Sequence, residues 1–586
     1  MSGIAGIITT AHRQLSFWNL STKTNPPLFS ADKRYGLVYC GTIYNAPDLK
    51  KELTGYPFLM QSDSEVVLAS FLKWGIQCFA KLNGMFAFGL WDTIENVLYL
   101  VRDQSGIKPV YYTVDDHRIL FASEVRAILA SGRIDRKLNP DGILEYFQYQ
   151  TVHTPHTLIN GINLLEAGWY LKIKADTQSI ERIKYADFAD AVGNDINKKP
   201  YDQIKNDVYH LLLKSVERQM VADIPTGVFL SGGIDSSIIA GLLSQLSNSP
   251  VNTFTVNFDE SDFSEAKYAR VIAKKFNANH QEILLKPSDF LNALPDALTA
   301  IDHPSGDGPN TWIVSREVAK HGIKVAFSGL GGDELFAGYA HFKRALMYNK
   351  YGYLAKFPYV IKYPCGYLLK KIKPSIATNK LVEVWMQNEW DLKNSYPIGR
   401  RMFLDNELSQ LLTLDVKKDR VKEICSSIAF HKNQVLSQVT LAEFNTYMQH
   451  VLLRDIGQMT ATIPIEGRLP FLDRDLITYV LTIPDTMKYP LTPKKLLVDS
   501  VGDLLPEEIM HRPKMGFVLP WNVWLKKDLY SFCDTLLANL CNRYFIKADY
   551  LRQLWQQFLT GNKTISWSRI WYLVVLEYWL EKYEID

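Results

Sequence analysis

The sequence is short of the features that mark several classes of protein. Its six cysteines show neither CxxC nor CxxxC spacing, which argues against a zinc knot or a disulfide framework. No apolar run is long enough to cross a bilayer, and no signal peptide precedes Ser2. The net charge of only +3 indicates no general affinity for nucleic acid or membranes. We therefore expect reduced thiols and a cytoplasmic location, with neither nucleic acid nor membrane as a partner.

The chain also lacks internal repeats and low-complexity tracts, so its 586 residues should fold as two or more ordinary globular domains. Residues 1–190 alternate short β-type runs with turns, which is typical of a layered α/β sandwich. A polar stretch at 193–200 forms a natural linker, and a helix is expected near 201–220. Strands and helices then alternate as in a doubly wound parallel sheet, and the last third is helical. We therefore expect a second, α/β domain over 200–586.

The most informative segment is SGGIDSS at residues 231–237, which lies between two apolar runs. That order predicts a buried strand, a glycine-rich turn and the start of a helix. Glycines let the backbone approach a ligand closely, and serine hydroxyls with free N–H groups at a helix N-terminus suit an anion. A carboxylate beside a bound phosphate, here Asp235, indicates a divalent cation. The segment therefore predicts a phosphate loop, although not a Walker loop, which ends in Gly-Lys-Ser/Thr.

A second glycine-rich turn, SGLGGDE at residues 328–334, follows another expected strand and places Asp333 just past its end. The carboxyl ends of parallel strands share one edge of a sheet, where α/β proteins bind their ligands. We therefore expect Asp235 and Asp333 to meet there, and two carboxylates beside a polyphosphate make a plausible Mg²⁺ site.

Two further segments, EGRLPFLD at 466–473 and RPKMGF at 512–517, complete a recognisable set. In this order and spacing, the four motifs resemble the synthetase domain of glutamine-dependent asparagine synthetases. The first eight residues, MSGIAGII, and GTIYN at 41–45 are similar to the amino-terminal glutaminase domain of that family. The resemblance covers nearly the whole chain. It implies a class II, Ntn-type glutaminase-like sandwich followed by a doubly wound ATP-pyrophosphatase domain, and an ATP- and Mg²⁺-dependent ligase that forms an acyl-adenylate.

The same resemblance implies a role for each motif residue. Asp235 and Asp333 would bind Mg²⁺, and Lys514 would neutralise charge developing on the α-phosphate and pyrophosphate. Glu466 would orient or deprotonate the attacking amine, unless it serves only as a buried ion-pair partner of Arg468 or Arg454. The residues expected to hold ATP, besides Asp235, are Ser231, Gly232, Gly233, Ser236 and Ser237 for pyrophosphate and Leu230, Val256 and Gly329 for adenosine.

The amino-terminal domain departs from its family at the residues that carry its chemistry. The family uses an amino-terminal cysteine, and this chain has Ser2, a much poorer nucleophile. The Arg-Gly-Pro-Asp segment is absent, Gln14 replaces the arginine that grips the glutamine carboxylate, and Cys40 replaces the oxyanion-hole asparagine. Asp63 alone matches, at the ammonium-binding position. We interpret the domain as a degenerate glutaminase; the alternative is a slow serine-based amidase.

Without a glutaminase, the amine must come from elsewhere. The second loop carries Leu330 where asparagine synthetases have an acidic residue and β-lactam synthetases a tyrosine, which argues against free aspartate as substrate. Asp307 would either hold an ammonium group or cap the helix that follows. Residues 341–382 hold nine Lys/Arg and no Asp/Glu among several tyrosines, which suits either an extended peptide with an acidic residue or a solvated helical insert with an aromatic inner face.

These observations favour a macrolactam synthetase of the lasso-peptide cyclase type. Such an enzyme adenylates an Asp or Glu side chain of a precursor peptide, which the peptide's own N-terminal amine attacks, and it works with a leader peptidase and a leader-binding protein. Holding both ends in one cleft makes the step intramolecular. The alternatives are an ammonia-dependent asparagine synthetase, a β-lactam synthetase and a catalytically silent scaffold of the same family.

Overall fold

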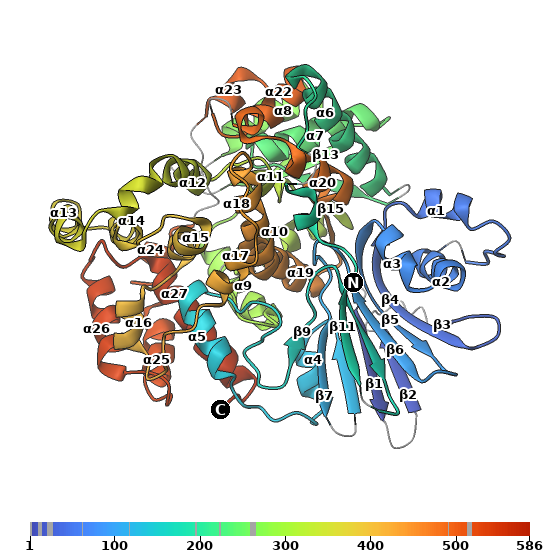
Figure 1. Cartoon of the computed structure of the whole chain (residues 1–586), viewed down its shortest axis with the longest axis horizontal. Coiled ribbons are helices and arrows are strands. Elements are labelled where there is room, and N and C mark those ends of the chain that lie inside the picture. The colour runs from blue at the N-terminus through green and yellow to red at the C-terminus, as the bar shows by residue number, and fades with distance from the viewer. Residues whose placement is uncertain are drawn as a thin grey trace.

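The computed structural model describes residues 3–9, 14–19, 27–60, 62–115, 118–177, 179–193, 196–221, 224–257, 265–306, 308–489, 492–512 and 519–586. Within these ranges the strands form three sheets, two antiparallel and one parallel. The antiparallel sheets lie at the lower right of Figure 1, and the helix-rich remainder of the chain lies above and to the left of them. The predicted α/β class is confirmed.

The first antiparallel sheet has the strand order β2-β1-β8-β7-β9, and the second has the order β11-β10-β6-β5-β4-β3. Side chains such as Ile4 and Phe121 from the first sheet and Val38 and Leu100 from the second are buried together in one cluster between them. The strands of both sheets are β1 Ile4–Thr9, β2 Gln14–Asn19, β3 Leu28–Phe29, β4 Tyr35–Ile43, β5 Gly84–Asp92, β6 Val97–Arg102, β7 Tyr111–Asp115, β8 Arg118–Ala122, β9 Asn163–Leu164, β10 Trp169–Lys174 and β11 Ile180–Lys184.

Helices cover the outer face of the second sheet. Leu49, Val67 and Phe79, from three helices, are buried against Phe86 and Phe88 of β5, so that face is as apolar as the face between the sheets. The helices of this half of the chain are α1 Ala46–Glu52, α2 Asp63–Trp74, α3 Cys78–Lys81, α4 Val125–Ala130 and α5 Pro140–Tyr149.

The third sheet is parallel throughout and has the order β14-β13-β12-β15-β16. Its strands are β12 Thr226–Phe229, β13 Asn252–Asn257, β14 Asn279–Leu284, β15 Val325–Phe327 and β16 Glu466–Arg468. Val228 of β12 lies level with Thr253 on one side and Phe327 on the other. This register brings the loops that follow β12, β13 and β15 to one edge of the sheet.

Helices pack on both faces of this sheet and continue into a helical carboxyl-terminal region. A π-helix over Phe444–Leu452 joins α18 to α19. The helices are α6 Tyr201–Gln219, α7 Ile234–Leu246, α8 Ala266–Lys275, α9 Pro287–Ala300, α10 Gly308–Lys320, α11 Gly332–Leu335, α12 Ala340–Tyr351, α13 Tyr359–Ile372, α14 Ile376–Met386, α15 Leu392–Arg400, α16 Asp405–Leu411, α17 Arg420–Ser426, α18 Val435–Glu443, α19 Leu453–Ala461, α20 Arg474–Thr482, α21 Asp485–Lys488, α22 Lys495–Val501, α23 Glu507–Met510, α24 Trp521–Trp524, α25 Tyr530–Leu540, α26 Ala548–Leu559 and α27 Trp567–Lys582. No helix within the described ranges combines the length and apolar character needed to span a bilayer.

Candidate active site at the carboxyl edge of the parallel sheet

The predicted phosphate loop forms a strand–turn–helix unit. β12 ends at Phe229, and α7 begins at Ile234 with Gly233 as its N-cap. The Ser231 and Ser236 hydroxyls lie 3.0 Å apart, and the Gly233 N–H donates to the Ser231 hydroxyl at 3.2 Å. Ser237 is fully buried one position further along α7. The turn therefore presents hydroxyls and the N-terminus of a long helix at the sheet edge, an arrangement that suits a phosphate.

Glycine is required at Gly232 for two physical reasons. Its φ of +65° lies in the left-handed region, which L side chains rarely adopt. A Cβ at this position would also lie 2.7 Å from the Tyr268 Cβ and 2.7 Å from the Ala269 nitrogen on α8. The loop is thus pressed against α8, and its path depends on the absence of a side chain.

The second loop meets the first at Gly329. A Cβ on Gly329 would lie 2.7 Å from the Asp235 Cβ and 2.8 Å from the Ser236 nitrogen, so the two loops are in direct contact. Leu330, next in the chain, is half-buried and packs against the apolar core, where an acidic residue would lose its hydration. Leu230 is buried after β12, and Val256 is half-buried near the end of β13. The structure thus brings the predicted adenosine-contacting residues to the same sheet edge.

Asp235 and Asp333 face one another across a buried lysine that the sequence did not reveal. The Lys494 Nζ lies 2.5 Å from the Asp235 Oδ2 and 2.6 Å from the Asp333 Oδ1. Burial opposes the charge on Lys494, but the two carboxylates overcome this effect and raise the pKa of its ammonium group. Lys494 is therefore a cation at neutral pH, held at the point where the two predicted Mg²⁺ ligands converge.

The donor set at this point fits a divalent cation bound together with a polyphosphate. Hard cations such as Mg²⁺ prefer oxygen ligands and are usually held by one or two carboxylates plus phosphate oxygens. Across the described ranges no three His, Cys, Asp or Glu side chains gather as a metal site, so the further ligands would come from phosphate or water. A cation bound by Asp235 and Asp333 would share them with Lys494 or displace it, and it would neutralise charge on the phosphates.

Arg512 ties the RPKMGF segment to the phosphate loop. Its guanidinium donates to the Ser231 and Gly232 carbonyls, at 3.2 and 2.9 Å, and forms an ion pair with Glu265. It also stacks 4.7 Å above the Tyr268 ring. The sequence assigned no role to Arg512. Its contacts join segments about 280 positions apart, and such contacts cannot be read from a local motif.

Glu466, on β16, faces the amino-terminal domain. Its Oε1 lies 3.0 Å from the Arg468 Nη1 and accepts from the Thr42 hydroxyl of β4 at 3.4 Å. Burial raises the pKa of Glu466, but Lys108 and Arg468 together outweigh burial and lower it, so the group is a carboxylate at neutral pH. The expected ion pair with Arg468 is present. The expected alternative partner, Arg454, instead donates to the Thr151 hydroxyl and the Val152 carbonyl.

A cavity of about 300 Å³ lies between the two halves of the chain. Gly3 and Cys40 line it on the amino-terminal side, and Glu466 and Gly467 line it on the synthetase side. Lys108 and Arg454 also contribute to its wall. The cavity therefore extends from the region of the expected glutaminase site to Glu466, at the start of the edge strand β16.

The structure describes only some of the residues that we expect at the glutaminase site. Cys40 is buried on β4, and Asp63, the first residue of α2, accepts a hydrogen bond from the Ile43 N–H at 2.9 Å. Burial raises the pKa of Asp63. Gln14 lies on β2, but its side chain is outside what the structure describes. Ser2 lies outside the described residues, as do Asp307 and Lys514 in the other half. The roles of all these residues remain predictions.

Two family models match the chain. The asparagine synthase model covers residues 207–581, and the glutamine amidotransferase domain model covers residues 3–185. Because the first match spans more than half of the chain, the protein belongs to the asparagine synthase family, a family of ATP-dependent carbon–nitrogen ligases.

Relatives match over nearly the full length. Asparagine synthetase [glutamine-hydrolyzing] 1 of Bacillus subtilis (strain 168) is 29% identical over 570 residues, 94% of this chain and 86% of that protein. Asparagine synthetase [glutamine-hydrolyzing] 3 of the same organism is 27% identical, with 94% and 88% covered. Amidase chyE of Penicillium rubens is 27% identical, with 88% and 82% covered.

Proposed function

We propose that this protein joins a carboxylate to an amine through an acyl-adenylate, with release of AMP and pyrophosphate. The observation that carries the proposal is the convergence of Asp235 and Asp333 on Lys494, beside the N-terminus of α7. Preorganised charge of this kind stabilises the transfer of a nucleotidyl group because it need not reorganise during the reaction. The membership of this protein in the asparagine synthase family also fits this reaction class.

Each charged group has a distinct task in this scheme. Asp235 and Asp333 would hold Mg²⁺ against the phosphates, while Lys494 and Lys514 would balance charge on the α-phosphate and the leaving pyrophosphate. Glu466 is placed to act on the attacking amine, because it is ionised and borders the cavity between the two halves.

The substrate that we propose is a peptide, and the reaction is macrolactam closure of the lasso-peptide type. Ser2, Gln14 and Cys40 replace the groups that would release ammonia from glutamine. Leu330 gives the second loop an apolar residue where free aspartate would need a polar or charged partner. A peptide that carries its own amine and its own Asp or Glu side chain meets both conditions. A leader peptidase and a leader-binding protein would supply it.

A second candidate, ammonia-dependent asparagine synthesis, is favoured by one observation. The cavity lined by Cys40 at one side and Glu466 at the other would give a small amine access to the synthetase half. The purified chain distinguishes the two functions when incubated with ATP and Mg²⁺. Formation of asparagine from aspartate and ammonia at a useful rate would overturn the cyclase proposal, and conversion of a leader-free precursor peptide to a product lighter by one water would support it.

The reaction class has its own test, which needs the carboxylate substrate but not the attack by the amine. We expect the wild type to exchange labelled pyrophosphate into ATP when its carboxylate substrate is present, and to release AMP when the amine attacks the acyl-adenylate. Exchange should be lost in Asp235→Asn and Lys514→Met. Asp499→Asn, at a half-buried ion pair with Lys495, is a matched control and should exchange normally. Release of ADP and phosphate would refute the class, and failure to bind ATP with Mg²⁺ would favour a silent scaffold.

A further inference from the structure

The segment that follows the second loop is strongly basic. Residues 341–382 contain nine Lys/Arg and no Asp/Glu, although the whole chain carries a net charge of only +3. Most of these cations are exposed, namely Lys343, Arg344, Lys350, Lys356, Lys370, Lys371 and Lys373. The balanced total therefore hides a local concentration of positive charge on one projecting part of the molecule.

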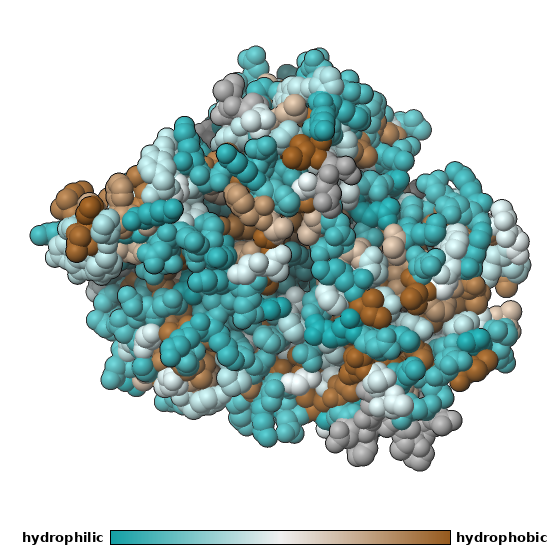
Figure 2. Space-filling view, in the orientation of Figure 1, coloured by the Kyte–Doolittle hydropathy of each residue, from teal (hydrophilic) through white to brown (hydrophobic). Residues whose placement is uncertain are grey.

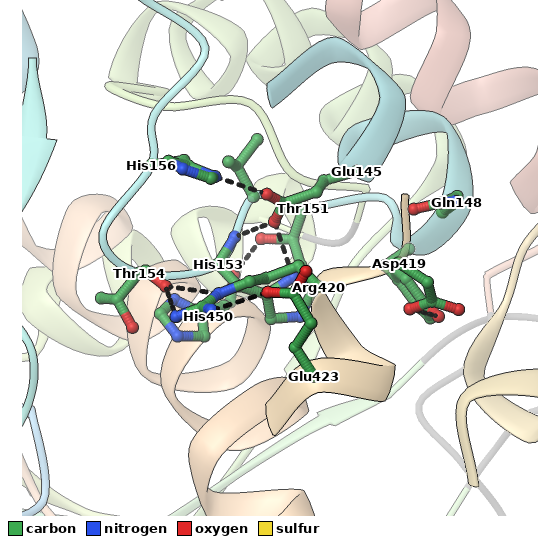
Figure 3. A network of polar contacts seen from close by, with 12 residues as sticks. Glu145, Gln148, Thr151, His153, Thr154, His156, Asp419, Arg420, Glu423 and His450 are labelled. Carbon is green, nitrogen blue, oxygen red and sulfur yellow. Dashed lines mark hydrogen bonds and ion pairs between the residues drawn. The ribbon is translucent and has the colours of Figure 1, made fainter. Parts of the chain in front are cut away.

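The same segment exposes apolar side chains. Residues 352–373, which we call the tip, comprise the turn before α13 and α13 itself. Val360 is 77% exposed and Ile372 is 72% exposed. Other large exposed side chains of the tip are Tyr353, Phe357, Tyr359, Ile361, Tyr363, Tyr367, Leu368 and Leu369. Figure 2 shows hydrophobic residues gathered at the left end of the molecule, where Figure 1 places α13.

The tip is held to the protein by a narrow contact. Lys362 and Gly366 are its buried positions on α13. The Lys362 ammonium donates to the Gln387 carbonyl at 2.8 Å and to the Ala355 carbonyl. A Cβ on Gly366 would lie 2.8 Å from Val382 of α14. Since this face already makes the packing contact, the tyrosines and most aliphatic side chains of α13 point outward. The aromatic inner face offered as one alternative is therefore absent from α13, although Tyr348 of α12 packs against Trp390.

The composition of the tip indicates what covers it. Protein interfaces are enriched in Tyr and Arg but depleted in Lys, and their cores exclude charge. A projecting helix that combines Lys with Tyr, Leu, Ile and Val instead matches segments that lie in the headgroup region of an anionic bilayer. We propose that the tip docks this protein on an anionic membrane surface, with α13 at the lipid boundary and the surrounding lysines on the headgroups.

Membrane docking through the tip would revise the expectation, drawn from net charge alone, that no membrane is a partner. Each Lys or Arg near an anionic surface strengthens the attraction to it, and the contributions of several exposed cations on one helix add together. The apolar side chains add burial that does not depend on salt. Binding should be peripheral, because the described helices lack the length and apolarity to span a bilayer.

The test is sedimentation of the full chain with lipid vesicles. Wild-type protein should sediment with vesicles of phosphatidylcholine and phosphatidylglycerol, and should remain in solution with phosphatidylcholine alone. Reversal of three exposed tip charges, Lys356→Glu, Lys371→Glu and Lys373→Glu, should weaken binding at least about a hundredfold. The matched control reverses Lys417, Lys422 and Lys432, exposed lysines elsewhere on the chain, and should leave binding within a few-fold of wild type.

A second variant tests the apolar part of the contact. Val360→Ser, Leu368→Ser and Ile372→Ser together remove exposed side chains, so the fold should tolerate them. Binding should weaken at least about tenfold and become fully salt-sensitive. Failure of the wild type to bind anionic vesicles, or equal loss in the control, would overturn the proposal. So would a wild-type dimer in solution that this variant converts to monomer, because a second copy would then cover the tip.

Cys365 offers a local readout. It is the exposed cysteine of α13, whereas Cys541 is half-buried and the other cysteines are buried. An environment-sensitive dye attached to Cys365 in a Cys541→Ser background should shift to the blue with anionic vesicles. An unchanged spectrum while the protein sediments would place the membrane contact elsewhere and refute the role of the tip.

Discussion

The Thr42 hydroxyl donates a hydrogen bond to the Glu466 carboxylate across 424 positions of sequence. Thr42 belongs to an antiparallel strand of the amino-terminal half, and Glu466 belongs to the edge strand of the parallel sheet. Arg468 closes the triangle, since its guanidinium reaches both the Thr42 hydroxyl and Glu466 at 3.0 Å. Glu466, the group that we propose acts on the attacking amine, is thus positioned by both halves of the chain.

Replacing Glu466 should separate the two chemical steps. We expect Glu466→Gln to retain pyrophosphate exchange within a few-fold but to slow amide formation about a hundredfold, because general base catalysis contributes on that scale. Measuring both rates on one preparation decides the matter. Parallel loss of exchange and amide formation would show that Glu466 acts only through its ion pair with Arg468.

Removing the buried cation between the two aspartates should cost stability and activity together. Lys494→Met leaves Asp235 and Asp333 facing one another, and breaking such a buried pair costs about 3–5 kcal/mol of unfolding free energy. Exchange should fall at least about a hundredfold. The neighbour Lys495, whose ion pair with Asp499 is more exposed, is the control, and Lys495→Met should cost less than about 1 kcal/mol.

Magnesium should partly compensate for the missing lysine. A divalent cation bound by Asp235 and Asp333 stabilises the folded state by mass action. The thermal midpoint of Lys494→Met should therefore rise with Mg²⁺ concentration more steeply than that of the wild type, in which Lys494 competes for the same carboxylates. Identical Mg²⁺ responses in both proteins would contradict a metal site at this position.

Glycine substitutions can separate backbone strain from crowding. Gly232 and Gly322 both have positive φ, but a Cβ meets α8 at Gly232 and nothing within 4 Å at Gly322. We expect Gly322→Ala to cost about 1 kcal/mol and Gly232→Ala at least about 3 kcal/mol, measured by denaturant unfolding. Equal costs would mean that the phosphate loop yields easily and is not pressed against α8.

Acid should weaken the fold through Glu443. Burial alone would raise the pKa of Glu443, but the Arg400 guanidinium and the His341 ring outweigh it and lower the pKa to about 2. A depressed carboxyl pKa contributes stability above the unfolded value near 4.5, and this contribution is lost as the pH falls toward 2. The contribution is about 3 kcal/mol at neutral pH.

Unfolding free energies measured over that pH range should therefore decline in the wild type and decline less in Glu443→Gln, which starts from a lower value. Glu423→Gln, at an exposed pair with Arg420, serves as the control and should follow the wild type. A wild type whose stability is flat between pH values of about 5 and 3 would contradict the assignment.

Local sequence patterns predicted the strands, helices and loops that short-range residue preferences determine. The β-type runs expected in the amino-terminal part of the chain correspond to strands of the two antiparallel sheets, and the expected helix near 201–220 corresponds to α6. Both glycine loops lie at the ends of parallel strands. Strand β2 was not predicted. The domain limits, 1–190 and 200–586, remain predictions, as do the roles assigned to the site residues.

What the sequence did not show depends on contacts between distant segments. Lys494 stands beside Lys495 in a stretch without a motif, and only the tertiary structure distinguishes the buried lysine from the exposed one. The outward direction of the tyrosines on α13 likewise could not be predicted from the sequence, because the neighbouring element decides which face of a helix packs. Here a buried lysine and a glycine, Lys362 and Gly366, take the inner face.

The interface between the halves limits how such a protein can change. Besides the Thr42–Glu466 contact, Asn83 donates to Asp473, and Arg474 donates to the carbonyl of Ala80. A lineage can replace nucleophile and oxyanion-hole side chains one at a time without disturbing these bonds. Deleting the amino-terminal half would instead remove these bonds, strip one wall from the cavity beside Glu466 and open it to bulk water. One half can therefore lose its catalytic residues and still keep its architecture. The need to keep that architecture constrains any attempt to engineer the synthetase half alone.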